Sequence, residues 1–142
     1  MRRGPVHDLQ ALYAGRLAPP PVIMELEEKR PLPPEQLKAR EAELIVGAVP
    51  AGAILVALDA GGSVWSSREF ADRLAAWRDG GVQNLAFAIG GADGLSRSLI
   101  ARADTVLSLG RMTWPHLLAR CMLLEQLYRA QTILTGHPYH RE

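Results

Sequence analysis

Apolar and polar positions follow two different spacings along the chain, one typical of helices and one typical of strands. Near the start, "DLQALYAGRL" places Leu9, Leu12, Tyr13 and Leu17 at helical spacing before the prolines of "APPP". The next segment, "VIMELEE" at residues 22–28, alternates apolar and polar residues and predicts a half-buried strand. The prolines of "RPLPPEQLKAREAELIVGAV" stand where a helix opens, so this stretch predicts a second helix.

The remainder of the chain repeats a strand, a glycine-rich loop and a helix three times. The first strand is expected at residues 53–59, "AILVALD", a nearly continuous apolar run. Its helix is expected over "SSREFADRLAAWRD", because Ser66 and Glu69 match a capping box and Gly80 and Gly81 follow the apolar stripe. "NLAFA" with "SRSLIARA", and "TVLSL" with a long helix from near His116, give the second and third repeats.

Strands that alternate with helices predict an α/β fold, with a mostly parallel sheet flanked by helices. At 142 residues the chain fits one domain, which we place at residues 1–142. Ligands of such folds bind outside the carboxyl ends of the strands. Three glycine loops fall there, at residues 59–62, 90–94 and 110–113.

The glycine loops match neither common phosphate-binding pattern, because G-x-G-x-x-G and G-x-x-x-x-G-K-[ST] are both absent from the sequence. Each loop alone is compatible with a simple tight turn. Three of them at one sheet edge favour a ligand pocket that backbone atoms approach closely.

Composition places the chain among ordinary globular proteins. Hydrophobic residues make up 48%, charged residues 22% and the net charge is +1, which excludes a disordered or strongly acidic protein. The pI near 8.0 is not high enough to indicate a nucleic-acid partner. The single cysteine, Cys121, allows no internal disulfide, and no apolar stretch is long enough to cross a membrane. We therefore expect a soluble, cytoplasmic protein.

The last helix is apolar on every side, which predicts burial on more than one side. We expect one side to face the sheet and the other to face a second subunit in a two-fold dimer. Glu125 and Arg129, one turn apart, are compatible with a plain ion pair. His116 is compatible with a capping role at the helix start.

The stretches "AIGGADGLS", "LSLGRMTWPHLLARCMLLEQLYRAQTI" and the terminal "HPYHRE" resemble the ribosomal RNA large-subunit methyltransferase H family, compact members of the SPOUT methyltransferases. The likeness runs in order from about Val22 to Glu142. It implies a C-terminal trefoil knot, a homodimer and S-adenosylmethionine bound in the knot loops. It also implies methylation of N3 of a pseudouridine in a 23S rRNA hairpin on the assembled ribosome.

The resemblance also assigns residues to roles. The cofactor-binding positions it implies are Leu58, Asp59, Gly90, Gly91, Gly94, Leu109, Gly110, Arg111, Met112, Thr113 and Trp114. The catalytic, substrate-side positions it implies are His116, Arg129, Tyr139, His140 and Arg141.

Those residue types fit the chemistry of methyl transfer to a ring nitrogen. N3 carries a proton until it reacts, so a base or stabilising cations would assist. His116, Tyr139 and His140 are base candidates among which the sequence does not choose, and Arg129 and Arg141 suit phosphate or developing negative charge. The histidines lack acidic or cysteine partners at ligand spacing, so we expect no metal site.

One departure from the resemblance concerns the start of the chain. Family members usually begin with a hydrophobic strand, and "MRRGPVHDLQALYAGRL" starts just after it. Three explanations stay open: a start codon assigned too late, a deliberate truncation, and a natural lineage without the strand. We favour the first as a hypothesis.

Two other functions stay open. One is a ribosome-associated RNA-binding protein that kept the fold and lost turnover. The other is a flavodoxin-like nucleotide-binding protein, which the strand–helix alternation alone would support.

Overall fold

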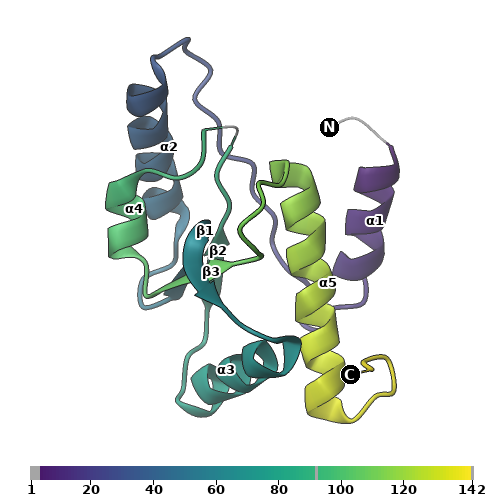
Figure 1. The fold of residues 1–142 in the computed structure, drawn as a ribbon. Coiled ribbons are helices and arrows are strands. Elements are labelled where there is room, and N and C mark those ends of the chain that lie inside the picture. The colour runs from purple at the N-terminus through teal and green to yellow at the C-terminus, as the bar shows by residue number, and fades with distance from the viewer. Residues whose placement is uncertain (1–3, 92, 142) are drawn as a thin grey trace. The chain divides into compact units, whose positions relative to one another are not determined.

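Five helices and three strands follow one another in the computed structural model, which describes residues 4–91 and 93–141 (Figure 1). In chain order they are α1 (Pro5–Ala14), α2 (Pro34–Ala48), β1 (Ile54–Val64), α3 (Ser67–Asp79), β2 (Leu85–Ala88), α4 (Arg97–Arg102), β3 (Thr105–Ser108) and α5 (His116–Thr135). Ala92 of the predicted second loop and Glu142 of the predicted tail lie outside the described residues.

The chain divides into two compact units. The helical unit contains α1, α3 and α5, and comprises the described residues up to 23, residues 65–81 and those from 114 onward. The sheet unit contains α2, α4 and all three strands, within residues 24–64 and 82–113.

The sheet unit contains the predicted parallel sheet. β1 is the central strand, with β2 on one side and β3 on the other, and both neighbours run parallel to it. Leu55 and Ala57 of β1 share a core cluster with Ala42 of α2 and Leu99 of α4. These two β1 positions are two residues apart and therefore face the same side of the strand, so α2 and α4 cover one face of the sheet.

The predicted end of the first strand at Asp59 is wrong. β1 continues to Val64, and the residues between Leu58 and Ser63 form an irregularity, because both of these positions pair with Leu107. Gly62 lies so close to β3 that an added Cβ would be 2.6 Å from the carbonyl oxygen of Val106. The first glycine segment is thus a bulge inside β1 and not a loop after it.

In the helical unit, both α1 and α3 pack against α5 (Figure 1). The predicted capping box of α3 is confirmed: Ser66 Oγ accepts from the Glu69 N–H at 3.0 Å, and Glu69 Oε1 accepts from the Ser66 N–H at 2.8 Å. Buried Cys121 of α5 donates to the carbonyl of Val6 in α1 at 3.4 Å. Two neighbouring helices therefore account for part of the apolar circumference of α5.

The strand predicted at residues 22–28 is not formed. Those residues carry no regular structure, and the side chains of Val22 and Met24 are 84% and 56% exposed. An alternating pattern yields a strand only where a neighbour pairs with it, and the sheet among the described residues holds only β1, β2 and β3.

No helix within residues 4–91 and 93–141 is both long enough and apolar enough to cross a membrane.

Candidate functional site

The loop after β2 is folded tightly on itself by its glycines. The N–H of Gly94 donates to the carbonyl of Gly91 at 3.0 Å, and Gly94 has a φ of 79° that favours glycine. An added Cβ on Gly90 would lie 2.5 Å from the carbonyl carbon of Gly94. Gly90 thus has no room for a side chain and Gly94 has a backbone conformation that favours glycine, whereas an added Cβ on Gly91 would meet no atom closer than 4.0 Å.

The loop after β3 is tied to the bulge of β1 by Ser108, which sequence reasoning missed. Its Oγ lies 3.1 Å from the carbonyl oxygen of Ala60 and 3.0 Å from that of Gly110, and it accepts from the Gly110 N–H at 3.0 Å. Ser108 is only 4% exposed. A polar residue at the end of the apolar run "TVLSL" was the available signal, because buried hydroxyls need partners.

The sheet unit brings together most of the predicted cofactor positions. Because the strands are parallel, the bulge of β1 and the segments after β2 and β3 share the carboxyl edge of the sheet. Leu58, Asp59 and Leu109 are half-buried, whereas the side chains of Arg111 and Met112 are exposed, as is Thr113. Trp114, the last predicted position, belongs to the helical unit. This edge offers backbone polar groups and apolar side chains to a small ligand.

Negative charge gathers beside the second loop. An added Cβ on Gly91 would lie 4.0 Å from Oε1 of Glu41, a half-buried residue of α2. Burial raises the pKa of the Glu41 carboxyl, and the charges of Glu27 and Asp93 raise it further.

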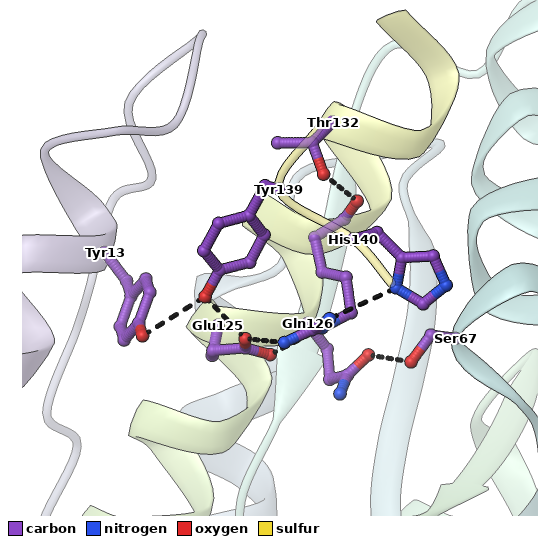
Figure 2. A network of polar contacts seen from close by, with 8 residues as sticks. Tyr13, Ser67, Glu125, Gln126, Thr132, Tyr139 and His140 are labelled. Atoms are coloured by element: carbon purple, nitrogen blue, oxygen red, sulfur yellow. Dashed lines mark hydrogen bonds and ion pairs between the residues drawn. The ribbon is translucent and has the colours of Figure 1, made fainter. Parts of the chain in front are cut away.

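The C-terminal tail docks on α5 through a polar network (Figure 2). The hydroxyl of Tyr139 donates to Oε2 of Glu125 at 2.8 Å and lies 3.4 Å from the hydroxyl of Tyr13 in α1. Glu125 also binds Arg129, with Nε to Oε1 at 3.3 Å and Nη2 to Oε2 at 2.5 Å. One carboxylate therefore holds both the tail tyrosine and the α5 arginine.

Arg129 makes two further contacts with the tail. Its Nη1 lies 3.1 Å from Nδ1 of His140, and its guanidinium is 5.0 Å from the ring centroid of Tyr139. The ring of Tyr128 meets that of Tyr139 edge to face at 4.7 Å. Residues 139 and 140 are half-buried in consequence, although they stand next to the chain end.

The network shifts two pKa values. The pKa of the Tyr139 phenol is raised above its ordinary value by the hydrogen bond with Tyr13, by burial and by the hydrogen bond to Glu125. The pKa of Arg129 is raised chiefly by its hydrogen bond to Glu125. Tyr139 thus stays neutral and Arg129 stays charged.

Three supporting residues were not predicted as part of a site. Tyr13 completes the tyrosine pair, and Glu125 was interpreted only as an ion-pair partner of Arg129. Gln126, beside Glu125, accepts from the hydroxyl of Ser67 at 2.7 Å and links α5 to α3 (Figure 2).

The structure does not bring all the predicted catalytic residues together. Arg129, Tyr139 and His140 meet in the network, and Arg141 next to them is exposed. His116 is the exposed first residue of α5, thirteen positions before Arg129 and so about 20 Å away along the helix axis. A capping role for His116 is wrong, because Pro115 is the N-cap and no side chain caps the helix.

No group of three or more histidine, cysteine or acidic residues within the described part of the chain is arranged to hold a metal ion.

Comparison with known proteins gives two concordant results. Residues 1–140 match the sequence model of the family described as predicted SPOUT methyltransferase. A protein of Paramagnetospirillum magneticum called ribosomal RNA large subunit methyltransferase H is 59% identical over 140 residues, which cover 99% of this chain and 92% of the relative. Proteins with the same name from Rhodospirillum centenum and Rhodospirillum rubrum are 54% and 51% identical over the same shares.

Proposed function

Because the chain belongs to the SPOUT methyltransferase family, we propose that it transfers a methyl group from S-adenosylmethionine to large-subunit ribosomal RNA. The relatives' shared name supports this substrate class. The acceptor we propose is N3 of a pseudouridine in a 23S rRNA hairpin, methylated on the assembled ribosome in the cytoplasm.

The observation that carries the proposal is the carboxyl edge of the sheet. Ser108 joins the bulge of β1, which contains Gly62, to the loop after β3, which contains Gly110. The folded loop of Gly90 to Gly94 lies at the same edge. We assign cofactor binding to this edge, including Leu58, Asp59 and the segment from Leu109 to Thr113. Bound there, S-adenosylmethionine would supply an electrophilic methyl group on its sulfonium.

We assign substrate binding to the substrate-side positions that the resemblance implies. Arg129 and Arg141 would hold phosphate or developing negative charge, because a guanidinium is always charged and presents several donors. Tyr139 and His140 are fixed next to Arg129 by the network. Positioning the ring nitrogen in line with the methyl group is the main catalytic requirement.

The separation of the substrate-side residues supports our proposal of a homodimer. His116 and the tail of one chain are too far apart along α5 to touch one base. In a dimer, His116 of one subunit would work with the tail of the partner subunit. The exposed side chains of Leu117, Leu118 and Leu134 on α5 suit such an interface.

The family also leads us to propose a C-terminal trefoil knot and a single domain across residues 1–142, since the matched region covers residues 1–140. The alternative function is a ribosome-binding protein of the same fold without turnover. A protein that no longer binds the cofactor would not need the close backbone contacts of the glycines at the carboxyl edge of the sheet. In this chain Gly62 and Gly90 both have such contacts, which favours the enzyme.

The test begins with calorimetric titration of the purified chain with S-adenosylmethionine, with the mass in solution measured on the same sample. We expect binding by a dimer, followed by methyl transfer to ribosomes that lack the modification. Deleting residues 139–142 should leave cofactor binding and abolish transfer. Absence of cofactor binding would refute the proposal, and binding without transfer by the intact chain would support the alternative.

A further inference from the structure

The contact between Arg129 and His140 fixes which ring nitrogen of the histidine carries a hydrogen. A guanidinium has only donors, so Nδ1 of His140, 3.1 Å from Nη1 of Arg129, must accept. An imidazolium carries N–H groups on both nitrogens and has nothing with which to accept. His140 in this network is therefore neutral, with its hydrogen on Nε2.

Tyr139 is fixed in a comparable way. A carboxylate only accepts, so the hydroxyl hydrogen of Tyr139 is engaged by Glu125 at 2.8 Å. The remaining contact of that oxygen is with the hydroxyl of Tyr13 at 3.4 Å. Tyr139 is thus a protonated phenol whose hydrogen already has a partner.

Glu125 determines both of these states. It holds Arg129 through two of the guanidinium nitrogens and Tyr139 through the hydroxyl. The third guanidinium nitrogen then meets His140. Glu125 and Arg129 retain only 19% and 24% side-chain exposure, so water competes weakly with these contacts.

We propose that His140 serves the reaction as an N–H donor through Nε2 and not as the acceptor of the substrate proton, with Glu125 as the residue that positions it through Arg129. This inference rests on the proposed methyltransferase function. Its ligand is an oxygen of the RNA that carries or gains negative charge, either a phosphate or a ring carbonyl.

The decisive comparison is between His140→Gln and His140→Ala in single-turnover methyl transfer over a range of pH. Glutamine places an amide N–H near the position of Nε2 but has no basic nitrogen. We expect His140→Gln to remain within about 10-fold of the wild type with the same pH profile, and His140→Ala to lose on the order of 10²-fold. If His140 were the base, both variants would fail alike by about 10²-fold or more, and a limb of the profile would disappear.

The charged and titratable groups linked to His140 in the network come from three segments: α1, α5 and the tail itself. Arg129 contacts His140 directly, and hydrogen bonds connect Arg129 onward to Glu125, Tyr139 and Tyr13. The profiles are therefore compared between variants that leave these four residues in place.

The kinetic constants separate the two possible oxygens. A phosphate is charged before and during the reaction, so loss of its donor should raise KM. A ring carbonyl gains charge only as N3 reacts, so loss of its donor should lower kcat.

Glu125→Gln tests the positioning role. It keeps an oxygen for Tyr139 but removes the charge that holds Arg129, so we expect a fall of about 10-fold or more in kcat with unchanged cofactor affinity. The matched control is Glu43→Gln, which removes an exposed carboxylate paired with Arg40 at 2.9 Å in α2 and should leave kcat unchanged. Equal rates for the two variants would refute the role of Glu125.

The tautomer can be measured without any activity. Nitrogen-15 NMR of the histidine rings, assigned with His140→Gln, should show the hydrogen of His140 on Nε2 at neutral pH. A hydrogen on Nδ1, or on both nitrogens, would overturn the inference even in a fully active enzyme. A wild type without transfer activity would refute the proposed function, and this spectrum would still decide the hydrogen-bond assignment.

Discussion

The hydroxyl of Ser108, at the end of β3, lies 3.1 Å from the carbonyl oxygen of Ala60 in the bulge of β1. The same hydroxyl accepts from the N–H of Gly110 at 3.0 Å. One buried side chain thus couples two segments that we assign to cofactor binding, so their relative position depends on it.

Ser108→Ala should weaken cofactor binding and lower stability. Its loss leaves the backbone groups of Ala60 and Gly110 without this partner, at a cost of about 0.5–1.5 kcal/mol in the free energy of unfolding. Calorimetry with S-adenosylmethionine and urea unfolding measure the two effects. Ser63→Ala, at an exposed position of β1, is the control. An unchanged cofactor affinity in Ser108→Ala would contradict the coupling.

Gly62→Ala should strain the contact between β1 and β3. The added Cβ would meet the carbonyl oxygen of Val106 at 2.6 Å, so the strands must separate, which we expect to cost about 1–3 kcal/mol. Gly47→Ala is the matched control, because its Cβ meets nothing within 4 Å and its helix should gain about 0.5–1 kcal/mol. Thermal unfolding of both variants checks the opposite signs.

The phenol of Tyr139 should titrate later than an ordinary tyrosine. The pKa of Tyr139 in the folded state is raised above the reference of 10.0. Between pH 10 and the folded-state pKa, the folded chain therefore keeps a proton that the unfolded chain has lost. This contribution to stability is complete below pH 10 and declines as pH rises toward the folded-state pKa. Tyrosinate absorbance should show one late transition that Tyr139→Phe removes. A titration of Tyr139→Phe identical in shape to the wild type would be inconsistent with this.

Glu41→Gln should stabilise the sheet unit at neutral pH. Burial and the charges of Glu27 and Asp93 raise the pKa of Glu41 above 4.5, so ionisation is less favourable in the folded chain. The stability that Glu41 contributes is present at low pH and falls as pH rises through its folded-state value. We expect a gain of less than about 1 kcal/mol at pH 7, since the carboxyl is only partly buried. Glu35→Gln, at an exposed position of α2, is the control, and its free energy of unfolding should not rise by more than that of Glu41→Gln.

Local signals in the sequence predicted most of the fold. Ser66 and Glu69 marked the start of α3 because a capping box involves only four consecutive residues. Pro34 and Pro115 marked the starts of α2 and α5 for a similar reason. The parallel sheet followed from apolar runs alternating with helices.

Features that depend on distant partners were not predictable in this way. Whether residues 22–28 form a strand depends on a pairing neighbour, which their own alternation does not encode. The bulge at Gly62 depends on the pairing of β1 with β3, in which Leu58 and Ser63 both pair with Leu107. The network escaped notice because Tyr13 and Tyr139 are 126 positions apart, and only the docked tail brings them together.

Complementation between two defective subunits should restore activity if the catalytic site uses both chains of a dimer. His116→Ala and a chain without residues 139–142 should each be inactive or severely impaired. When the two are co-expressed at equal levels, half of the dimers are mixed, and in each of these one of two sites has both His116 and an intact tail. We therefore expect about a quarter of wild-type transfer. The control pairs His116→Ala with His116→Ala carrying the same deletion, which leaves no intact site. If the mixed dimers stayed as inactive as this control, a site shared between subunits would be excluded, and His116 would have no catalytic partnership with the tail.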